Sequence, residues 1–163
     1  MGEMTVVNEE LGYTVGMNER LNEDKSIRTP LRVRYAETDQ MGVVYHSNYL
    51  VWFEIGRVEY MRAHGFSYKE MEEESGCMIA VVEATARYRA PARYDEELVV
   101  ETELVAVRGA VIRFGYKVVR PEDGVLLCEG HTVHVVVGRD MKRRRLPEKY
   151  AALLASARVE SLV

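Results

Sequence analysis

The second half of the chain contains four long segments whose residue types favour β-strands. Each is rich in Val, Ile and Tyr or alternates charged residues with Leu and Val: Met78–Ala90, Glu97–Val107, Val111–Arg120 and Val125–Val137. Turn-forming residues separate them, at Ala90–Asp95, Arg108–Gly109 and Pro121–Gly124. Because these connections are short, we expect the strands to be antiparallel neighbours in one sheet.

A strand, a loop and a long helix precede this sheet. From Ile27 to Tyr35 apolar residues alternate with arginines, which is typical of a half-buried strand, and a loop follows over Ala36–Ser47. Asn48 is a residue type that caps helices, and the chain from there to His64 is compatible with a helix that Gly65 ends. The first turns, Tyr49–Phe53, are apolar all round, so we expect this helix to be buried at the centre of the core.

Two shorter helices complete the pattern. Ser67 and Glu70 have capping-box spacing, which predicts a helix that runs to Ser75 and ends at Gly76, and Pro147–Arg158 predicts a closing helix. The predicted fold is therefore α+β, with a five-stranded antiparallel sheet and a long central helix. One helix covers only one face of such a sheet, and long strands leave exposed edges, so we expect the chain to associate.

Length and composition indicate one globular domain. The chain has 163 residues, of which 47% are hydrophobic and 29% charged, and no apolar stretch approaches the length of a membrane span. The N-terminus lacks the pattern of a secretory signal, and the spacing of Cys77 and Cys128 fits neither a disulfide framework nor a metal or redox pair. We expect a cytoplasmic protein with two buried, reduced thiols.

The net charge of −4 is unevenly distributed along the chain. Residues 1–26 carry six acidic and two basic side chains, whereas residues 27–163 are neutral overall. We interpret residues 1–26 as an acidic extension, flexible or loosely docked, and residues 27–163 as a single domain. Within that domain Arg139 and Lys142–Arg145, opposed only by Asp140, form a basic island. This distribution argues against a general nucleic-acid binder but suits one small polyanionic ligand.

The loop before the long helix places a carboxylate near a helix N-terminus. Asp39 is followed by Gly42 at a turn, and Tyr45–Asn48 lead directly into the helix, where backbone N–H groups lack intrahelical acceptors. A carboxylate that acts as base or nucleophile, close to donors that hold an oxyanion, is the minimal equipment for acyl transfer. On spacing alone, the alternative that Asp39 is an ordinary turn residue stays open.

The segment YAETDQMGVVYHSNYLVWFEIGRVEYM, with APARYDE and MKRRRLP further on, resembles the 4-hydroxybenzoyl-CoA thioesterase family of hot-dog proteins, and within it the YbgC-like acyl-CoA thioesterase branch. The resemblance covers residues 27–155. It implies a hot-dog fold, in which the sheet wraps around the long helix, and dimers or tetramers with active sites between subunits. It also implies hydrolysis of acyl-CoA to a free acid and coenzyme A.

For the site, the resemblance implies that Asp39 is the catalytic carboxylate, as nucleophile or as base toward water. The backbone N–H of His46, beside Ser47 at the helix start, would bind the thioester carbonyl oxygen, and Tyr35 and the His46 side chain match residues that line or support the site. We expect no metal and no other cofactor, because coenzyme A belongs to the substrate and product. Lys142, Arg143 and Arg144 are candidates for the coenzyme's phosphates, against the alternative of a solvated basic run.

Two other carboxylates have either a structural or a catalytic role. Glu37 would pair with Asp39 if the chain is extended there, but we favour a solvated Glu37. Glu54 falls in the helix predicted to be buried, and we favour an ion pair with Arg57 over direct catalysis, although a different hot-dog branch uses a helix Glu.

The histidines outside the loop are predicted to be structural. His131 and His134 are three residues apart on a strand, so they face opposite sides of the sheet and do not form a metal-binding pair. His64 lies near the C-terminus of the long helix, where a positive charge is favourable.

Two other functions are consistent with the fold. One is dehydration of acyl thioesters, but the hydratase motif with its His and Asp is not found in this sequence. The other is a non-enzymatic module that binds acyl-CoA or acyl-carrier protein, which would bind the thioester without releasing thiol. The preferred acyl chain length is not predicted by this sequence.

Overall fold

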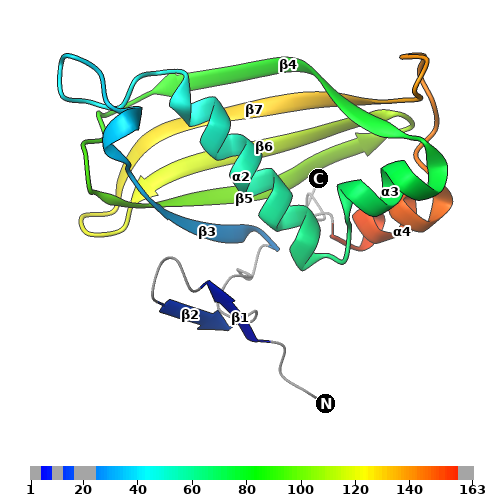
Figure 1. Cartoon of the computed structure of the whole chain (residues 1–163), viewed down its shortest axis with the longest axis horizontal. Helices are drawn as coiled ribbons and strands as arrows, with labels where there is room; N and C mark the ends of the chain where they lie inside the picture. Colours follow the sequence, from blue (N-terminus) through cyan, green and yellow to red (C-terminus); the bar gives the residue numbers. More distant parts are fainter. Residues whose placement is uncertain (1–4, 9–12, 17–24, 158–163) are drawn as a thin grey trace, which may run out of the picture.

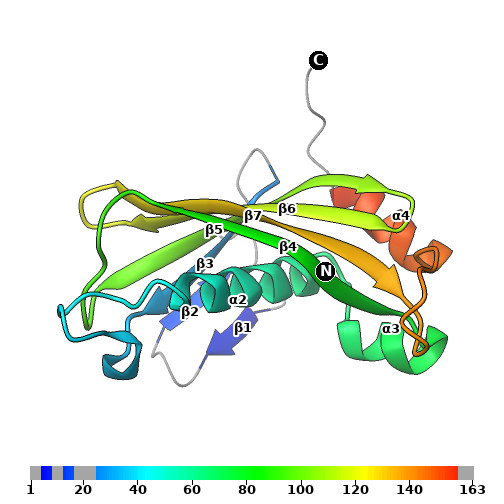
Figure 2. The ribbon, with the colours of Figure 1, turned by 90° about the horizontal axis from the view of Figure 1, so that it is seen from above.

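A five-stranded antiparallel sheet curves over one long helix, α2 (Asn48–Ala63), in this computed structural model (Figures 1 and 2). The structure describes residues 5–8, 13–16 and 25–157. The strand order is β3-β5-β6-β7-β4, with bounds β3 (Ile27–Arg32), β4 (Met78–Tyr88), β5 (Glu97–Arg108), β6 (Val111–Arg120) and β7 (Val125–Val137). The predicted fold class is confirmed.

The two shorter helices lie at one end of the sheet, as Figure 1 shows. They are α3 (Tyr68–Ser75) and α4 (Glu148–Ala157). The predicted cap of α3 is confirmed, because Ser67 accepts a hydrogen bond from the backbone N–H of Glu70 and Gly76 ends the helix with a φ of +67°. The hydroxyl of Tyr150 donates to Glu74 at 2.9 Å and ties α4 to α3.

Part of the N-terminal extension pairs with itself. Strands β1 (Thr5–Asn8) and β2 (Tyr13–Gly16) form a separate two-stranded antiparallel sheet. The predicted flexibility of residues 1–26 concerns mostly residues outside the described ranges and stays a prediction.

Helix α2 packs closely on the concave face of the sheet. A Cβ atom at Gly56 would lie 2.4 Å from Oγ1 of Thr102 on β5, so only glycine allows this approach. Phe53 stacks on Tyr116 of β6, with ring centroids 4.4 Å apart and planes 8° from parallel. The core therefore lies between one side of α2 and the sheet.

The prediction that α2 is buried all round is wrong. Tyr49, Trp52 and Phe53 are buried, but Leu50 and Val51 are 40% and 46% exposed, because the sheet covers only one side of the helix. The predicted cap also differs: Ser47 is the capping residue, without a side-chain hydrogen bond, and the Asn48 side chain donates instead to the carbonyl of Glu37 at 2.9 Å.

Two predicted strand features are also wrong. The first strand ends at Arg32, and Tyr35 lies in a 3-10 turn, η1 (Tyr35–Glu37), because Glu37 bonds back to Arg34 and bends the chain. Short connections make β6 a neighbour of β5 and of β7, but β4 does not pair with β5. Instead β4 pairs with β7, and the link to β5 is held by a hydrogen bond from Val44 N–H to the carbonyl of Ala92.

Both cysteines are free and buried, as predicted. Among the described helices, none is long and apolar enough to cross a membrane.

Candidate active site

The loop before α2 folds into a small hairpin at the N-terminal end of that helix (Figure 1). The N–H of Tyr45 donates to the carbonyl of Glu37 at 2.9 Å, Thr38 and Val44 form a β-bridge, and the N–H of Asp39 donates to Val43 at 2.9 Å. Gly42 closes the tip with a φ of +76°, a conformation that side chains disfavour. The hairpin places Asp39 near its tip and His46 past its returning arm.

Asp39 keeps part of its carboxylate free. Its Oδ1 accepts a hydrogen bond from the backbone N–H of Met41 at 2.8 Å, which fixes the side chain in the turn. Its Oδ2 has no hydrogen-bond donor among the described residues. The side chain is partly exposed, so this oxygen is available to a water molecule or a substrate.

The backbone at His46 and Ser47 offers hydrogen-bond donors. Neither N–H has an acceptor within the described part of the chain, and both precede the first turn of α2, where the helix dipole favours negative charge. The carbonyl of His46 is held by the hydroxyl of Tyr88 on β4, at 2.9 Å. The peptide is therefore anchored on one side while its neighbouring donors are unused, an arrangement that suits an oxyanion.

The prediction of a solvated Glu37 is wrong, because this side chain is only 4% exposed. Its Oε1 accepts from Nε1 of Trp52 at 3.0 Å and from Nη2 of Arg34 at 3.1 Å, and its Oε2 accepts from the backbone N–H of Arg34 at 2.8 Å. Burial alone would raise the pKa of Glu37, but these hydrogen bonds outweigh it and hold the pKa below its ordinary value. Its carboxylate is occupied by these donors and is not paired with Asp39.

Tyr35 lies at the base of the loop, with its ring 77% exposed. It meets the exposed ring of Tyr94 edge to face, with centroids 5.6 Å apart. Tyr35, Asp39, His46 and Ser47 thus all lie on one loop. In the structure Tyr88 and Trp52 also contact this loop, through hydrogen bonds to His46 and Glu37. The sequence did not predict these contacts, because they form only when β4 and α2 pack against the loop.

The basic island is not brought together with this loop. It forms the turn after β7, where the N–H of Gly138 donates to the carbonyl of Lys142 and Arg143 forms a β-bridge with Val137. Arg144 pairs with Asp140 at 2.8 Å. Val137 lies opposite Met78, the first residue of β4, whereas Tyr88, the last, contacts His46. The loop and the island therefore lie at opposite ends of β4 (Figure 1). The strand has eleven residues, which span roughly 30 Å.

The predicted ion pair between Glu54 and Arg57 is wrong. Glu54 lies on the exposed side of α2. Nη1 of Arg57 donates instead to the hydroxyl of Tyr116 at 3.4 Å, because its position on the helix faces the sheet.

His131 and His134 face opposite sides of the sheet, as predicted. His134 is fully buried, and its Nε2 lies 2.7 Å from Oγ1 of Thr132. Burial lowers the pKa of His134 from 6.5 to about 4. His131 lies on the other face, where its Nε2 is 2.8 Å from Oε1 of Glu83. His64 caps the C-terminus of α2, and its Nδ1 is 2.8 Å from the carbonyl of Tyr60.

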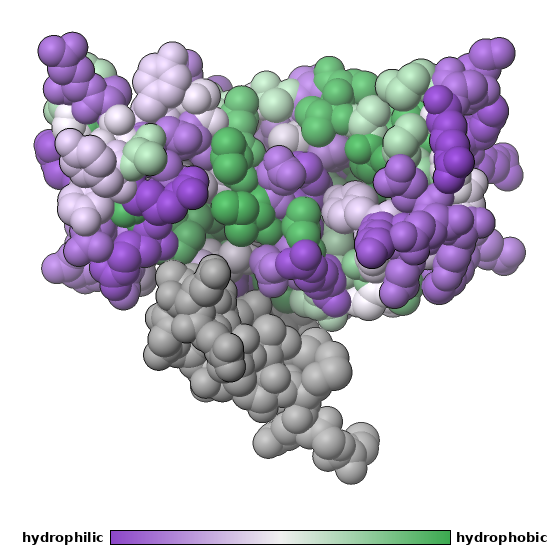
Figure 3. Space-filling view, viewed as in Figure 1, coloured by the Kyte–Doolittle hydropathy of each residue, from purple (hydrophilic) through white to green (hydrophobic). Residues whose placement is uncertain are grey.

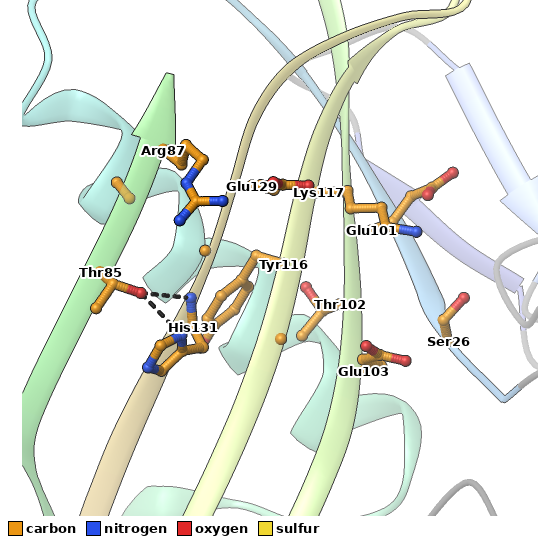
Figure 4. Close-up of a pocket in the computed structure, with 13 residues that line it drawn as sticks. Ser26, Thr85, Arg87, Glu101, Thr102, Glu103, Tyr116, Lys117, Glu129 and His131 are labelled. Carbon is orange, nitrogen blue, oxygen red and sulfur yellow. Dashed lines mark hydrogen bonds between the residues drawn. The ribbon is translucent and has the colours of Figure 1, made fainter. Parts of the chain in front are cut away.

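A hollow of about 500 Å³ lies elsewhere, on the sheet face that carries His131 (Figure 4). Its walls include Thr85, Arg87, Glu103, Lys117 and His131, and its lining contains no residue of the loop 35–48. The loop lies at an open end of the sheet. If a second chain completes the substrate groove, that groove is not a cavity within a single chain. The size of this hollow therefore does not argue against the loop as the reaction site.

Comparison with known proteins shows the family of the chain. The model of the Thioesterase-like superfamily matches residues 33–155. The chain belongs to the Thioesterase-like superfamily. Within this superfamily, acyl-CoA thioester hydrolase YbgC of Escherichia coli is 38% identical over 126 residues, which cover 77% of this chain and 92% of that protein. The family that the motif resembles is therefore confirmed.

Two solved structures have a similar fold. Protein TT1821 from Thermus thermophilus is 40% identical, with a TM-score of 0.74 over 80% of this chain and 98% of that one. The DHNA-CoA thioesterase from Staphylococcus aureus is 34% identical, with a TM-score of 0.73 over 80% of this chain and 86% of that one.

Proposed function

We propose that this chain hydrolyses acyl-CoA thioesters to a free carboxylic acid and coenzyme A, with the reaction at the loop 35–48. The observation that carries the proposal is that one short loop holds both a carboxylate with a free oxygen and backbone N–H groups that lack acceptors among the described residues. Membership of the Thioesterase-like superfamily and 38% identity to a protein named acyl-CoA thioester hydrolase support it.

In the proposed reaction, Asp39 either attacks the thioester carbonyl carbon directly or takes a proton from a water molecule that attacks this carbon. The N–H groups of His46 and Ser47 stabilise the negative charge that develops on the carbonyl oxygen. One such donor is worth about 3 kcal/mol of activation free energy. The C–S bond breaks and the sulfur leaves as the coenzyme thiolate. After direct attack, water hydrolyses the mixed anhydride on Asp39, which releases the free acid and restores the carboxylate. When Asp39 acts as base, the proton taken from water passes on to the thiolate. A thioester is already electrophilic, so the reaction needs neither a metal nor another cofactor.

We propose that two chains complete the site by joining along β4. The edge at β3 contains Pro30, which cannot donate to a neighbouring strand, whereas β4 is eleven residues long and contains no proline. Exposed apolar side chains gather along β4 and the open side of α2 (Figure 3): Leu50, Val51, Ile55, Val81 and Val82. Such a patch favours a protein partner over solvent.

A two-fold axis through the middle of β4 has a consequence for coenzyme binding. It makes the two β4 strands antiparallel, so the start of one strand lies beside the end of the other. The basic island of the partner chain then lies near Tyr88 and His46 of this chain, whereas the basic island of this chain lies far from them. We propose that Lys142, Arg143 and Arg144 bind the coenzyme's phosphates across this interface.

We also propose that the protein acts in the cytoplasm.

The test of the proposed activity is thiol release by the purified chain. Acetyl-, hexanoyl-, palmitoyl- and 4-hydroxybenzoyl-CoA are offered with a thiol-reactive dye, with and without a chelator. We expect release of free coenzyme A from at least one substrate, unchanged by the chelator. Tight binding of all four without thiol release would instead identify a binding module, and release that the chelator abolishes would contradict the metal-free reaction.

A further inference from the structure

We infer that Glu37 is a positioning residue for this hydrolysis, which holds the peptides of His46 and Ser47 in place from beneath the loop. The inference rests on the proposed function. The carboxylate of Glu37 touches neither Asp39 nor any group proposed to meet the substrate, so the effect of Glu37 must pass through the loop and the helix.

The carboxylate of Glu37 ties the start of the loop to the second turn of α2. Its two oxygens accept hydrogen bonds from the backbone and side chain of Arg34, which precedes the loop, and from the indole N–H of Trp52. Trp52 is 1% exposed and packs against Tyr49, with ring centroids 4.8 Å apart. An ion buried in this way must keep its partners, because breaking one leaves charge without compensation.

The carbonyl of Glu37 holds the other side of the loop. It accepts the backbone N–H of Tyr45 at 2.9 Å and Nδ2 of Asn48 at 2.9 Å. His46 and Ser47 lie between these two donors in the sequence. Their N–H groups therefore cannot shift appreciably unless a hydrogen bond to Glu37 breaks.

Glutamate is required here by the pattern of donors. Both oxygens accept, so the amide of a glutamine would satisfy only one side and would turn its own N–H₂ toward another donor. A displacement of about 1 Å at the oxyanion donors is enough to cost about a hundredfold in rate. Substrate binding along the rest of the coenzyme would be affected far less.

The test compares Glu37→Gln, Trp52→Phe and their double variant with Tyr60→Phe as the matched control. Tyr60 lies on α2, as Trp52 does, and both side chains are buried. The hydroxyl of Tyr60 donates one hydrogen bond, to the carbonyl of Ala157 at 2.9 Å, away from the loop. With the substrate that the wild type hydrolyses fastest, we expect Glu37→Gln to lower kcat about a hundredfold and change KM less than about threefold. The double variant should lose little more than Glu37→Gln, whereas Tyr60→Phe should keep kcat.

Two readouts do not depend on catalysis. Trp52 is the only tryptophan, so its fluorescence reports on the contact, and hydrogen exchange reports on the loop amides. We expect Glu37→Gln and Trp52→Phe to speed exchange over residues 39–48 about tenfold or more relative to Tyr60→Phe, and Glu37→Gln to shift the emission. If Glu37→Gln does not fold, Trp52→Phe decides with the same expectations on a smaller scale.

Unchanged loop exchange in the folded variants would overturn the inference, and so would an equal loss of kcat in Tyr60→Phe. If the wild type releases no thiol from any of the four substrates, the proposed function fails, while the exchange experiment still decides whether Glu37 holds the loop.

Discussion

At the scale of single residues, the peptide of His46 is also held from the edge of the sheet. The hydroxyl of Tyr88 donates to its carbonyl, and the ring of Tyr88 packs against Tyr49 with centroids 5.2 Å apart. Tyr88→Phe removes the hydrogen bond but keeps the ring. Since such a bond is worth about 1 kcal/mol, we expect kcat to fall about fivefold and the melting temperature to fall by no more than a few degrees. A variant with wild-type kcat would show that this anchor does not matter.

His134 predicts how stability depends on pH. The folded protein holds this residue neutral, because burial, assisted by the charge of Arg57, lowers its pKa from 6.5 to about 4. The unfolded chain binds a proton below pH 6.5, so the contribution of neutral His134 is complete above that pH and is lost as the pH falls toward 4.

We therefore expect urea unfolding to show a smaller loss of stability between pH 7 and pH 5 in His134→Gln than in the wild type. The difference should be about 2 kcal/mol, and the comparison cancels the other histidines and the carboxylates. Parallel stability curves for the two proteins would mean that His134 titrates normally in the fold.

The site was only partly predictable from the sequence at this scale. Asp39, His46 and Ser47 are local to one motif, and the structure keeps them on one loop. Glu37 is different, because its partner Trp52 is fifteen residues away and reaches it only after the helix has packed. An isolated glutamate in a loop sequence carries no sign of that burial.

At the scale of secondary-structure elements, the contact between α2 and β5 depends on one glycine. Because a Cβ at Gly56 would come within 2.4 Å of Oγ1 and 2.8 Å of a methyl group on the facing strand, Gly56→Ala forces the helix away from the sheet. We expect a loss of about 2 kcal/mol of unfolding free energy, measured by urea denaturation. Gly124→Ala, at an exposed turn with φ of +71°, is a control in which strain alone acts. Stability equal to wild type in Gly56→Ala would contradict this close packing.

The predicted ends of helices and strands agree with the structure where turn-forming or capping residues stand at those ends. Strands β6 and β7 and the capped helix α3 have the predicted ends. The neighbour of β4 could not be predicted in the same way, because its partner is β7, and two other strands separate β4 from β7 in the sequence. The apolar run at Tyr49–Phe53 was likewise compatible with full burial, and only the one-sided sheet leaves Leu50 and Val51 exposed.

At the scale of the whole molecule, the basic island lies too far from the loop of its own chain to meet the same coenzyme molecule, so the proposed phosphate role depends on a second chain. Mixed dimers test this directly. One chain carries Asp39→Asn and the other carries Arg143→Ala with Arg144→Ala. If the island acts across the interface, the mixed dimer contains one intact site, so we expect a wild-type KM for acyl-CoA at about half the wild-type kcat.

The parent dimers are the controls. Asp39→Asn alone should be nearly inactive, and the double arginine variant alone should raise KM for acyl-CoA but not for the matching acyl-pantetheine. A mixed dimer that keeps the raised KM would place the island on the same chain as its site. Equal losses with acyl-CoA and acyl-pantetheine would remove the phosphate role altogether.

The central claim is that Asp39 carries thioester hydrolysis, and the most direct measurement is thiol release by Asp39→Asn. Asparagine preserves the size of the side chain and its acceptor for Met41 N–H, but it removes the negative charge that attacks or takes the proton. We expect kcat to fall by about a thousandfold or more, with folding and acyl-CoA binding retained. Near-normal turnover by folded Asp39→Asn would contradict the account.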